Sequence, residues 1–129
     1  MPEELTSKIT EVTKKSNTAE EGSVSETGDV MWLPSYIEVM GTVDSEFQTA
    51  SSTLKQEGSQ YQLFRDAGVT TDGNNSVLVM HSGSQASAWW LRSADVANEN
   101  AWFYVNAAGH ATDKAPADSN YLLVPCFCI

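Results

Sequence analysis

The segment between residues 95 and 120 is rich in the side chains that proteins use to recognise other molecules. It combines tryptophan and tyrosine with several asparagine, aspartate and serine residues and one histidine. Aromatic rings give a wide contact area for few frozen torsions, and asparagine and serine give adaptable hydrogen bonds, as in antibody combining sites. The segment therefore predicts a recognition surface, with an ordinary polar loop as the alternative.

Alternation along residues 102–106 divides the side chains between two faces of a predicted strand. Successive side chains of a strand point to opposite sides, so Phe103 and Val105 share one face and we expect that face to lie against the core. The other face, with Trp102 and Tyr104, is expected to meet solvent. The candidate ligand-binding residues are Trp102, Tyr104, Asn106, His110, Asn120, Asn98 and Asn100.

Catalytic and metal-binding chemistry is weakly represented in the chain. Cys126 and Cys128 lie in an apolar segment, where burial raises the pKa of a thiol, so we expect buried free thiols rather than a redox or metal pair. His81 and His110 are far apart and have no close nitrogen or thiolate partners, which argues against zinc. The sequence triplets of calcium-dependent sugar sites are absent. We expect no catalytic residue, metal or cofactor.

Ser35 and Glu38 have the spacing of a capping box, in which each side chain bonds the other residue's backbone N–H. They predict a short helix that ends at Gly41. The alternative, a catalytic pair, has no base nearby. Both residues are therefore expected to be structural.

Residues 89–93 (WWLRS) and 122–129 predict two anchored strands around the polar segment. Trp89 and Trp90 point to opposite faces, so one is expected in the core and the other beneath a loop layer. Arg92 shares a face with Trp90 and is expected to clamp loop carbonyls, with a ligand anchor as the alternative.

The N-terminal part of the chain predicts less order. Leu5, Ile9 and Val12 repeat at helical spacing and predict an amphipathic helix within residues 1–16. Residues 17–29 are polar and predict a flexible connector. The core is expected over residues 30–129, and the length of 129 residues predicts one domain.

The amino-acid composition argues against two classes of partner, nucleic acids and anionic membranes. Seventeen acidic against seven basic residues give a net charge of -10, which repels nucleic acid and anionic membranes. No apolar run approaches the roughly 20 residues that cross a membrane, and the acidic start gives no sign of a secretory signal. We therefore expect no nucleic acid or membrane partner, and the location is left open.

Five motifs in order resemble one family. They are residues 33–41 (LPSYIEVMG), 57–64 (EGSQYQLF), 89–93 (WWLRS), 103–109 (FYVNAAG) and 124–129 (VPCFCI). The chain resembles an uncharacterised domain family of gut bacteria and their phages that carries a Trp-Leu-Arg-Ser strand and ends near Val-Pro-Ala-Phe-Cys-Ile. Cys126 stands where alanine is usual in that family.

The resemblance implies a C-type-lectin-like fold, shared with formylglycine-generating enzymes and with variable proteins of diversity-generating retroelements. It implies an α+β domain of short mixed antiparallel strands with one or two flanking helices. Members begin further upstream, so the chain is expected to be a natural short form or a fragment without its opening strand.

We expect a non-catalytic module that binds a protein or glycan receptor on a phage particle or a bacterial surface. Its variable loops are a candidate for diversification by a retroelement. The alternatives are a phage or cell-surface assembly subunit, with a homo-oligomer as its form, and an enzyme of the formylglycine-generating type.

Overall fold

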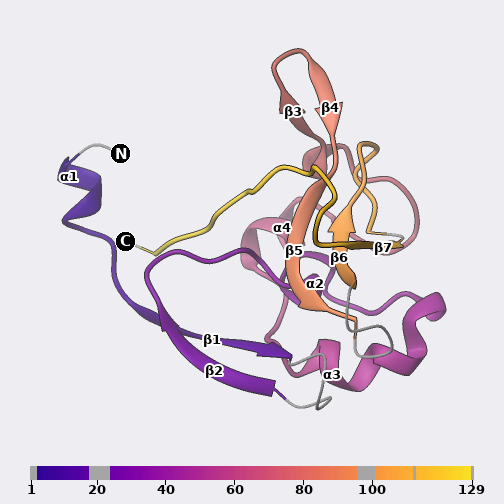
Figure 1. Ribbon diagram of the computed structural model, residues 1–129, viewed down its shortest axis with the longest axis horizontal. Coiled ribbons are helices and arrows are strands. Elements are labelled where there is room, and N and C mark those ends of the chain that lie inside the picture. The colour runs from indigo at the N-terminus through magenta and orange to yellow at the C-terminus, as the bar shows by residue number, and fades with distance from the viewer. Residues whose placement is uncertain (1–2, 18–23, 96–100, 112, 129) are drawn as a thin grey trace.

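Short helices and short antiparallel strands alternate along the chain (Figure 1). The structure is a computed structural model that describes residues 3–17, 24–95, 101–111 and 113–128. Its elements are α1 (Glu3–Thr6), β1 (Val12–Asn17), β2 (Val24–Asp29), α2 (Tyr36–Met40), the 3-10 helix η1 (Ser45–Ala50), α3 (Ser51–Lys55), α4 (Gln62–Asp66), the 3-10 helix η2 (Ser76–Leu78), β3 (Met80–Ser82), β4 (Gln85–Ser87), β5 (Trp89–Ala94), β6 (Ala101–Val105) and β7 (Asp113–Pro116). The expected α+β class is confirmed.

The described strands form three small antiparallel sheets. β1 pairs with β2, and β3 pairs with β4 in a hairpin that projects from the body (Figure 1). The third sheet has the order β5-β6-β7. Trp90 lies opposite Tyr104 and Ala94 lies opposite Trp102, so β5 carries extra residues between these pairs. Such an irregularity increases the local bend of a sheet.

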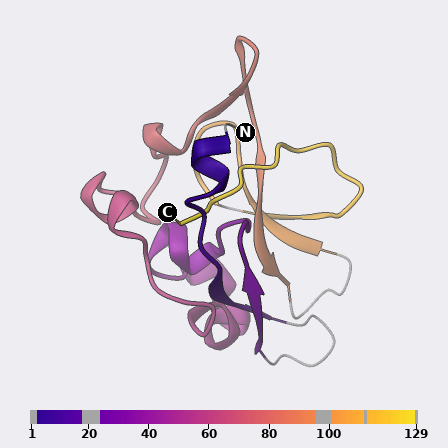
Figure 2. The same cartoon turned by 90° about the vertical axis from the view of Figure 1, so that its left-hand side faces the viewer.

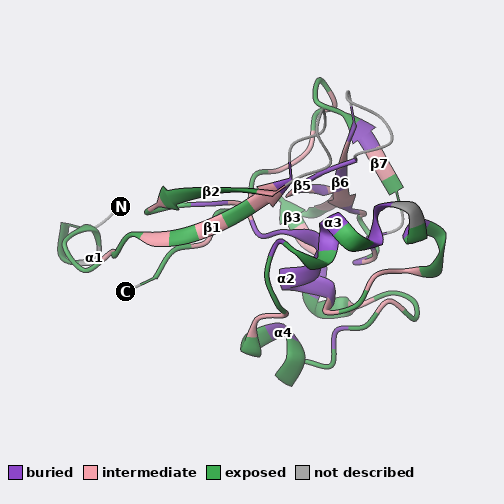
Figure 3. Ribbon diagram, turned by 90° about the horizontal axis from the view of Figure 1, so that it is seen from below, coloured by how far each residue is buried: buried purple, intermediate pink, exposed green. Residues whose placement is uncertain are grey.

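The core lies between the inner face of the third sheet and the helices. Trp89, Phe103 and Val105 are fully buried there. Tyr36, Phe47 and Phe103 meet edge to face, with ring centroids 5.0 to 5.9 Å apart, a geometry that adds to the hydrophobic gain from burial. Figure 3 shows the buried residues gathered on α2, β5 and β6.

Helix α2 forms where the capping box predicted it. The Ser35 hydroxyl accepts from the Glu38 N–H at 3.2 Å, and the Glu38 carboxylate accepts from the Ser35 N–H at 2.9 Å. The helix stops at Gly41, whose φ of 79° suits glycine. The predicted capping box between Ser35 and Glu38 is present.

The predicted helix within residues 1–16 and the predicted connector over 17–29 are wrong for the described residues. Only Glu3–Thr6 is helical, and Val12–Asn17 and Val24–Asp29 form the two strands of a hairpin. Along β1 more and less exposed residues alternate, with Lys14 on the more buried side. The apolar pattern of the sequence did not reveal this alternation, because Lys14, one of the inward residues, is charged.

Residues 122–128 do not form the continuous strand expected of them. They make isolated bridges, from Leu122 to Trp89, from Cys126 to Trp32 and from Cys128 to Thr10. The segment therefore runs from the third sheet back to the part of the chain near α1, as two views show (Figures 1 and 2). The predicted burial of the thiols is wrong, since Cys126 is half-buried and Cys128 exposed, although both are free.

Candidate functional site

Strand β6 presents two different faces, as its alternation predicted. Phe103 and Val105 are fully buried, whereas Trp102 and Tyr104 are half-exposed on the other side. The cross-strand neighbours of Trp102 are Ala94 and Ala115. The outward and inward assignments of these side chains are confirmed.

Three aromatic rings gather on the outer side of the third sheet, and we call Trp90, Tyr104 and Tyr121 the aromatic cluster. The Tyr104 ring centroid lies 4.7 Å from that of Tyr121 and 6.4 Å from that of Trp90, and the Trp90 and Tyr121 centroids are 4.9 Å apart. The rings come from β6, β5 and the C-terminal segment. All three are half-exposed, so their edges and faces remain available for stacking.

The Tyr104 hydroxyl is neutral over a wide pH range. Partial burial, together with the neighbouring Tyr121 and Asp113, raises the pKa of Tyr104 to about 12. A neutral phenol can both donate and accept a hydrogen bond. The aromatic cluster thus offers ring surface together with a polar hydroxyl.

Asn106 and His110 are held in the turn that follows β6. The Asn106 carboxamide oxygen accepts from the N–H groups of Ala108 and His110 at 3.0 and 3.1 Å. His110 Nε2 lies 3.0 Å from the Thr71 carbonyl oxygen. The Asn106 side chain therefore shapes the turn, and His110 links it to the neighbouring loop at Thr71.

Gly109 completes the contact between this turn and the loop around Asn75. Its carbonyl accepts from the Asn75 N–H at 3.0 Å, and its φ is 85°. A Cβ at this position would collide with the Asn75 carbonyl oxygen. Only glycine meets both demands.

The remaining predicted ligand-binding residues are asparagines. Asn120 is exposed and directly precedes Tyr121 of the aromatic cluster. Asn98 and Asn100 lie outside the described residues. Tyr121 was missed by sequence reasoning, and its position beside Asn120 was the available signal.

The paired tryptophans lie on opposite faces of β5, as predicted. Trp89 is fully buried, and its indole N–H donates to the Leu78 carbonyl at 2.8 Å. A buried indole N–H needs such a partner. Trp90 lies on the opposite face, in the aromatic cluster. The strand that carries the cluster is thus fixed from beneath by Trp89.

Arg92 donates to the backbone carbonyls of three other chain segments. Its guanidinium donates to the Leu33 carbonyl at 2.6 Å and to the Lys15 carbonyl at 3.0 and 3.2 Å. It also donates to the Glu57 carbonyl at 3.5 Å. Arg92 joins the third sheet to β1 and to the chain before α2, and a planar fork of five donors suits this role.

Glu38 lies between two cations, and we call Lys14, Glu38 and Arg92 the charged joint. One carboxylate oxygen of Glu38 accepts from Arg92 at 2.9 Å and the other pairs with Lys14 at 2.5 Å. The Glu38 side chain is only 2% exposed. Burial raises the pKa of Glu38, but hydrogen bonds from Lys14, Ser35 and Arg92 outweigh burial and bring the pKa below its ordinary value.

Tyr61 and Trp32 surround the Lys14 end of the charged joint. The Lys14 ammonium donates to the Tyr61 hydroxyl at 3.0 Å and lies 4.9 Å from the centre of the Trp32 ring. The Trp32 indole N–H donates to the same hydroxyl at 2.8 Å. Sequence reasoning missed the roles of Lys14 and Tyr61. A search for apolar patterns does not find an inward lysine, and the Tyr61 hydroxyl meets Lys14 across 47 residues of chain.

Glu57 is a second buried carboxylate beside the charged joint. It accepts from the Ser93 hydroxyl at 2.7 Å and from the Asn17 backbone N–H at 3.2 Å. Burial raises the pKa of Glu57 to about 7, despite the lowering effect of Ser93, Asn17 and Arg92. Glu57 belongs to residues 57–64, one of the motifs that carried the resemblance, and no role had been assigned to it.

Within the described ranges, no group of three or more histidine, cysteine, aspartate or glutamate residues is arranged to hold a metal ion. No helix in the described part of the chain is long and apolar enough to span a bilayer.

The fold and the site define the chain as a mixed α+β domain built from short antiparallel strands. The family described as "Domain of unknown function (DUF6273)" matches residues 1–129. The chain therefore belongs to this family. Comparison with curated proteins gave no match, and comparison with solved structures gave none either.

Proposed function

We propose that the protein is a non-catalytic binding module whose outer sheet face contacts a protein or glycan receptor. The observation that carries the proposal is the aromatic cluster, in which three half-exposed rings from three chain segments pack within 6.4 Å of one another. Exposed aromatic groups held on a rigid sheet are common in recognition surfaces. Trp102, on the same face, and Asn120 extend this surface.

We propose further that the fold is C-type-lectin-like, as the resemblance implies. The bridge between Thr10 and Cys128 supports this, because the last strand of that fold pairs with one near the chain start. The sharper version is a phage or bacterial surface binder diversified by a retroelement, supported by the asparagine-rich composition of residues 94–120. A neighbouring reverse transcriptase with a near-copy of this coding region would support it, and a locus without either would contradict it.

A second candidate function is that of an assembly subunit. Val30 and Met31 precede the Trp32–Cys126 bridge and Phe127 follows it, and all three are exposed. Leu123, at 69% exposure, lies on the same C-terminal segment. Exposed apolar side chains on neighbouring segments are a feature of oligomer interfaces. Light scattering that finds a stable oligomer, lost in Phe127→Ser, would favour this candidate.

The experiment for the binding function is a glycan and cell-surface array followed by substitution. Replacing both Trp102 and Tyr104 with alanine should abolish binding to any target found on the array, while the melting temperature changes little. Leu63→Ala, an exposed apolar residue on α4, is the control and should bind normally. Tyr104→Phe keeps the ring and should retain most of the binding.

Two outcomes would contradict the binding proposal. Binding that survives the double substitution would place the contact surface elsewhere. Equal losses of binding and of thermal stability in the double variant, with Tyr104→Phe unaffected in both, would mean that these rings serve only the fold.

A further inference from the structure

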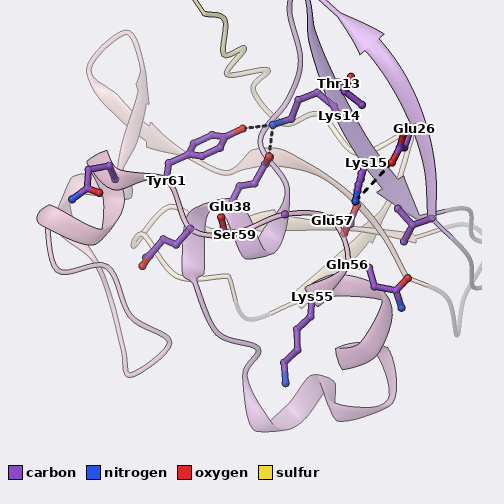
Figure 4. A pocket seen from close by; sticks show the side chains of 14 residues that line it. Thr13, Lys14, Lys15, Glu26, Glu38, Lys55, Gln56, Glu57, Ser59 and Tyr61 are labelled. Atoms are coloured by element: carbon purple, nitrogen blue, oxygen red, sulfur yellow. Dashed lines mark hydrogen bonds and ion pairs between the residues drawn. The ribbon is translucent and has the colours of Figure 1, made fainter.

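The basic residues of this acidic chain are concentrated beside two adjoining hollows. Of seven lysines and arginines in the chain, Lys14, Lys15 and Lys55 line the first hollow, while Lys55 and Arg65 line the second. The first lies between the β1–β2 hairpin and residues 55–62 and has a volume of about 850 Å³. The hollows share Lys55, Gly58, Ser59 and Gln60 (Figure 4 shows the first).

The acidic side chains at these hollows leave an excess of positive charge. Glu26, Glu38 and Glu57 line the first hollow, and no acidic residue lines the second. Glu38 is already neutralised by the charged joint. Burial makes Glu57 a weak acid with a pKa of about 7. Glu26 partly offsets Lys15 at 3.7 Å, which leaves Lys55 as a positive charge without an acidic partner among the residues described at this hollow, in a chain of net charge -10.

Several polar groups at the first hollow are available to a ligand. Lys55, Gln56 and Ser59 are exposed, and their side chains form no hydrogen bond or ion pair with other residues in the part of the chain that the structure describes. Lys15 pairs with Glu26 at 3.7 Å, but both side chains are exposed. An exposed ion pair of this kind contributes little free energy and leaves the lysine able to bind a ligand. An ammonium, a carboxamide and a hydroxyl are the groups that bind carboxylates and sugar hydroxyls.

The wall between the hollows is fixed rather than adaptable. Gln60 donates to the carbonyls of Val39 and Val69 at 3.0 and 3.2 Å, which attaches the shared segment to α2 and to the loop after α4. Tyr61 is held by Lys14 and Trp32. A preformed wall lowers the entropy cost of binding.

We propose that the first hollow is a binding site for an acidic saccharide, with Lys15 and Lys55 meeting its carboxylate and Gln56 and Ser59 its hydroxyls. The volume falls within the range of small-molecule sites, and the polar lining favours a polyhydroxylated ligand over an apolar one. None of the aromatic cluster residues lines this hollow, so the site is separate from the surface proposed above and its failure would leave that proposal intact.

The test is a titration of the full chain with digalacturonate, followed by amide chemical shifts in two-dimensional NMR. We expect shifts at residues 15 and 55–59 and little change at Tyr104. A neutral digalactose should bind at least tenfold more weakly. Acetate, which has a carboxylate but no ring, should also bind at least tenfold more weakly.

Matched substitutions separate the site from general charge. Lys55→Gln and Lys15→Gln should each weaken digalacturonate binding about fivefold or more with an unchanged melting temperature, because both side chains are exposed. Lys8→Gln removes the same charge from an exposed residue that lines neither hollow and should leave binding unchanged. Absence of binding, equal affinity for digalactose or acetate, or an equal effect of Lys8→Gln would overturn the proposal.

Discussion

The third sheet and the β1–β2 hairpin are attached to the molecule by different forces. The sheet buries Trp89, Phe103 and Val105 against aromatic rings and helices. The inward residues of β1 include Lys14 and Asn17, which bind Glu38, Glu57 and the Ala94 carbonyl through ion pairs and hydrogen bonds. Figure 3 shows the same contrast, since buried residues alternate with half-buried ones along β5 and β6 but are scarce along the hairpin.

The difference teaches that the two regions should respond to different perturbations. Apolar burial is nearly independent of pH and depends on volume. A buried ion pair depends on both partners, because removal of one leaves an uncompensated charge in the interior. The hairpin should therefore be sensitive to single polar changes and to pH, whereas the sheet should be sensitive to cavities.

The largest expected effect is in the sheet core. Phe103→Ala should lower the free energy of unfolding by about 3–5 kcal/mol, because it removes a fully buried ring that contacts Tyr36 and Phe47. Urea denaturation at pH 5 and pH 7 should give the same loss. Leu63→Ala, at an exposed apolar position, is the control and should cost less than about 0.5 kcal/mol. A small loss for Phe103→Ala would mean that this face is not the centre of the core.

The next effect is in the charged joint. Arg92→Met should cost about 3 kcal/mol in the free energy of unfolding, because the Leu33 and Lys15 carbonyls lose their donor and Glu38 keeps only Lys14. Arg65→Met, in which an exposed arginine on α4 loses one long hydrogen bond, should cost little. Equal effects of the two substitutions in urea denaturation would show that the fork of Arg92 is not structural.

A smaller effect is the pH dependence due to Glu57. The pKa of Glu57 in the folded state, about 7, lies above the ordinary value of 4.5. The folded state therefore binds the Glu57 proton more tightly than the unfolded state does. The stability that results is fully present below pH 4.5 and is lost as the pH rises through 7. Between pH 5 and pH 7 the loss is roughly 2 kcal/mol. The difference in unfolding free energy between the protein and Glu57→Gln should change by that amount. Glu26→Gln, on the exposed hairpin surface, should follow the protein, and parallel profiles for Glu57→Gln would contradict the assignment.

Sequence patterns predicted the parts of the fold that apolar or local interactions determine. The Ser35–Glu38 capping box determines where α2 begins, and Gly41 determines where it ends. The alternation of residues along β6 determines which of its side chains are buried. The same alternation placed Tyr104 on the outer face, whereas Tyr121 of the aromatic cluster was missed. These elements were predictable because their partners lie nearby or because their burial follows residue type.

The hairpin could not be predicted in this way. Lys14 points inward because it forms an ion pair with Glu38 and donates a hydrogen bond to Tyr61. These partners lie 24 and 47 residues further along the chain. Glu57 and Asn17 are likewise buried by contacts with distant residues. The C-terminal segment was expected to be a buried strand because of its apolar residues, but its bridges are isolated and leave alternate side chains exposed. Long-range pairing, rather than composition, decided these elements.

The most direct test of the central claim, that polar contacts hold the hairpin and apolar contacts hold the sheet, is amide hydrogen exchange in Arg92→Met at pH 7. We predict that the amides of Val12–Asn17 and Val24–Asp29 lose protection by at least tenfold relative to those of Trp89–Ala94 and Ala101–Val105. A uniform loss across both regions, or unchanged protection of the hairpin, would contradict the account.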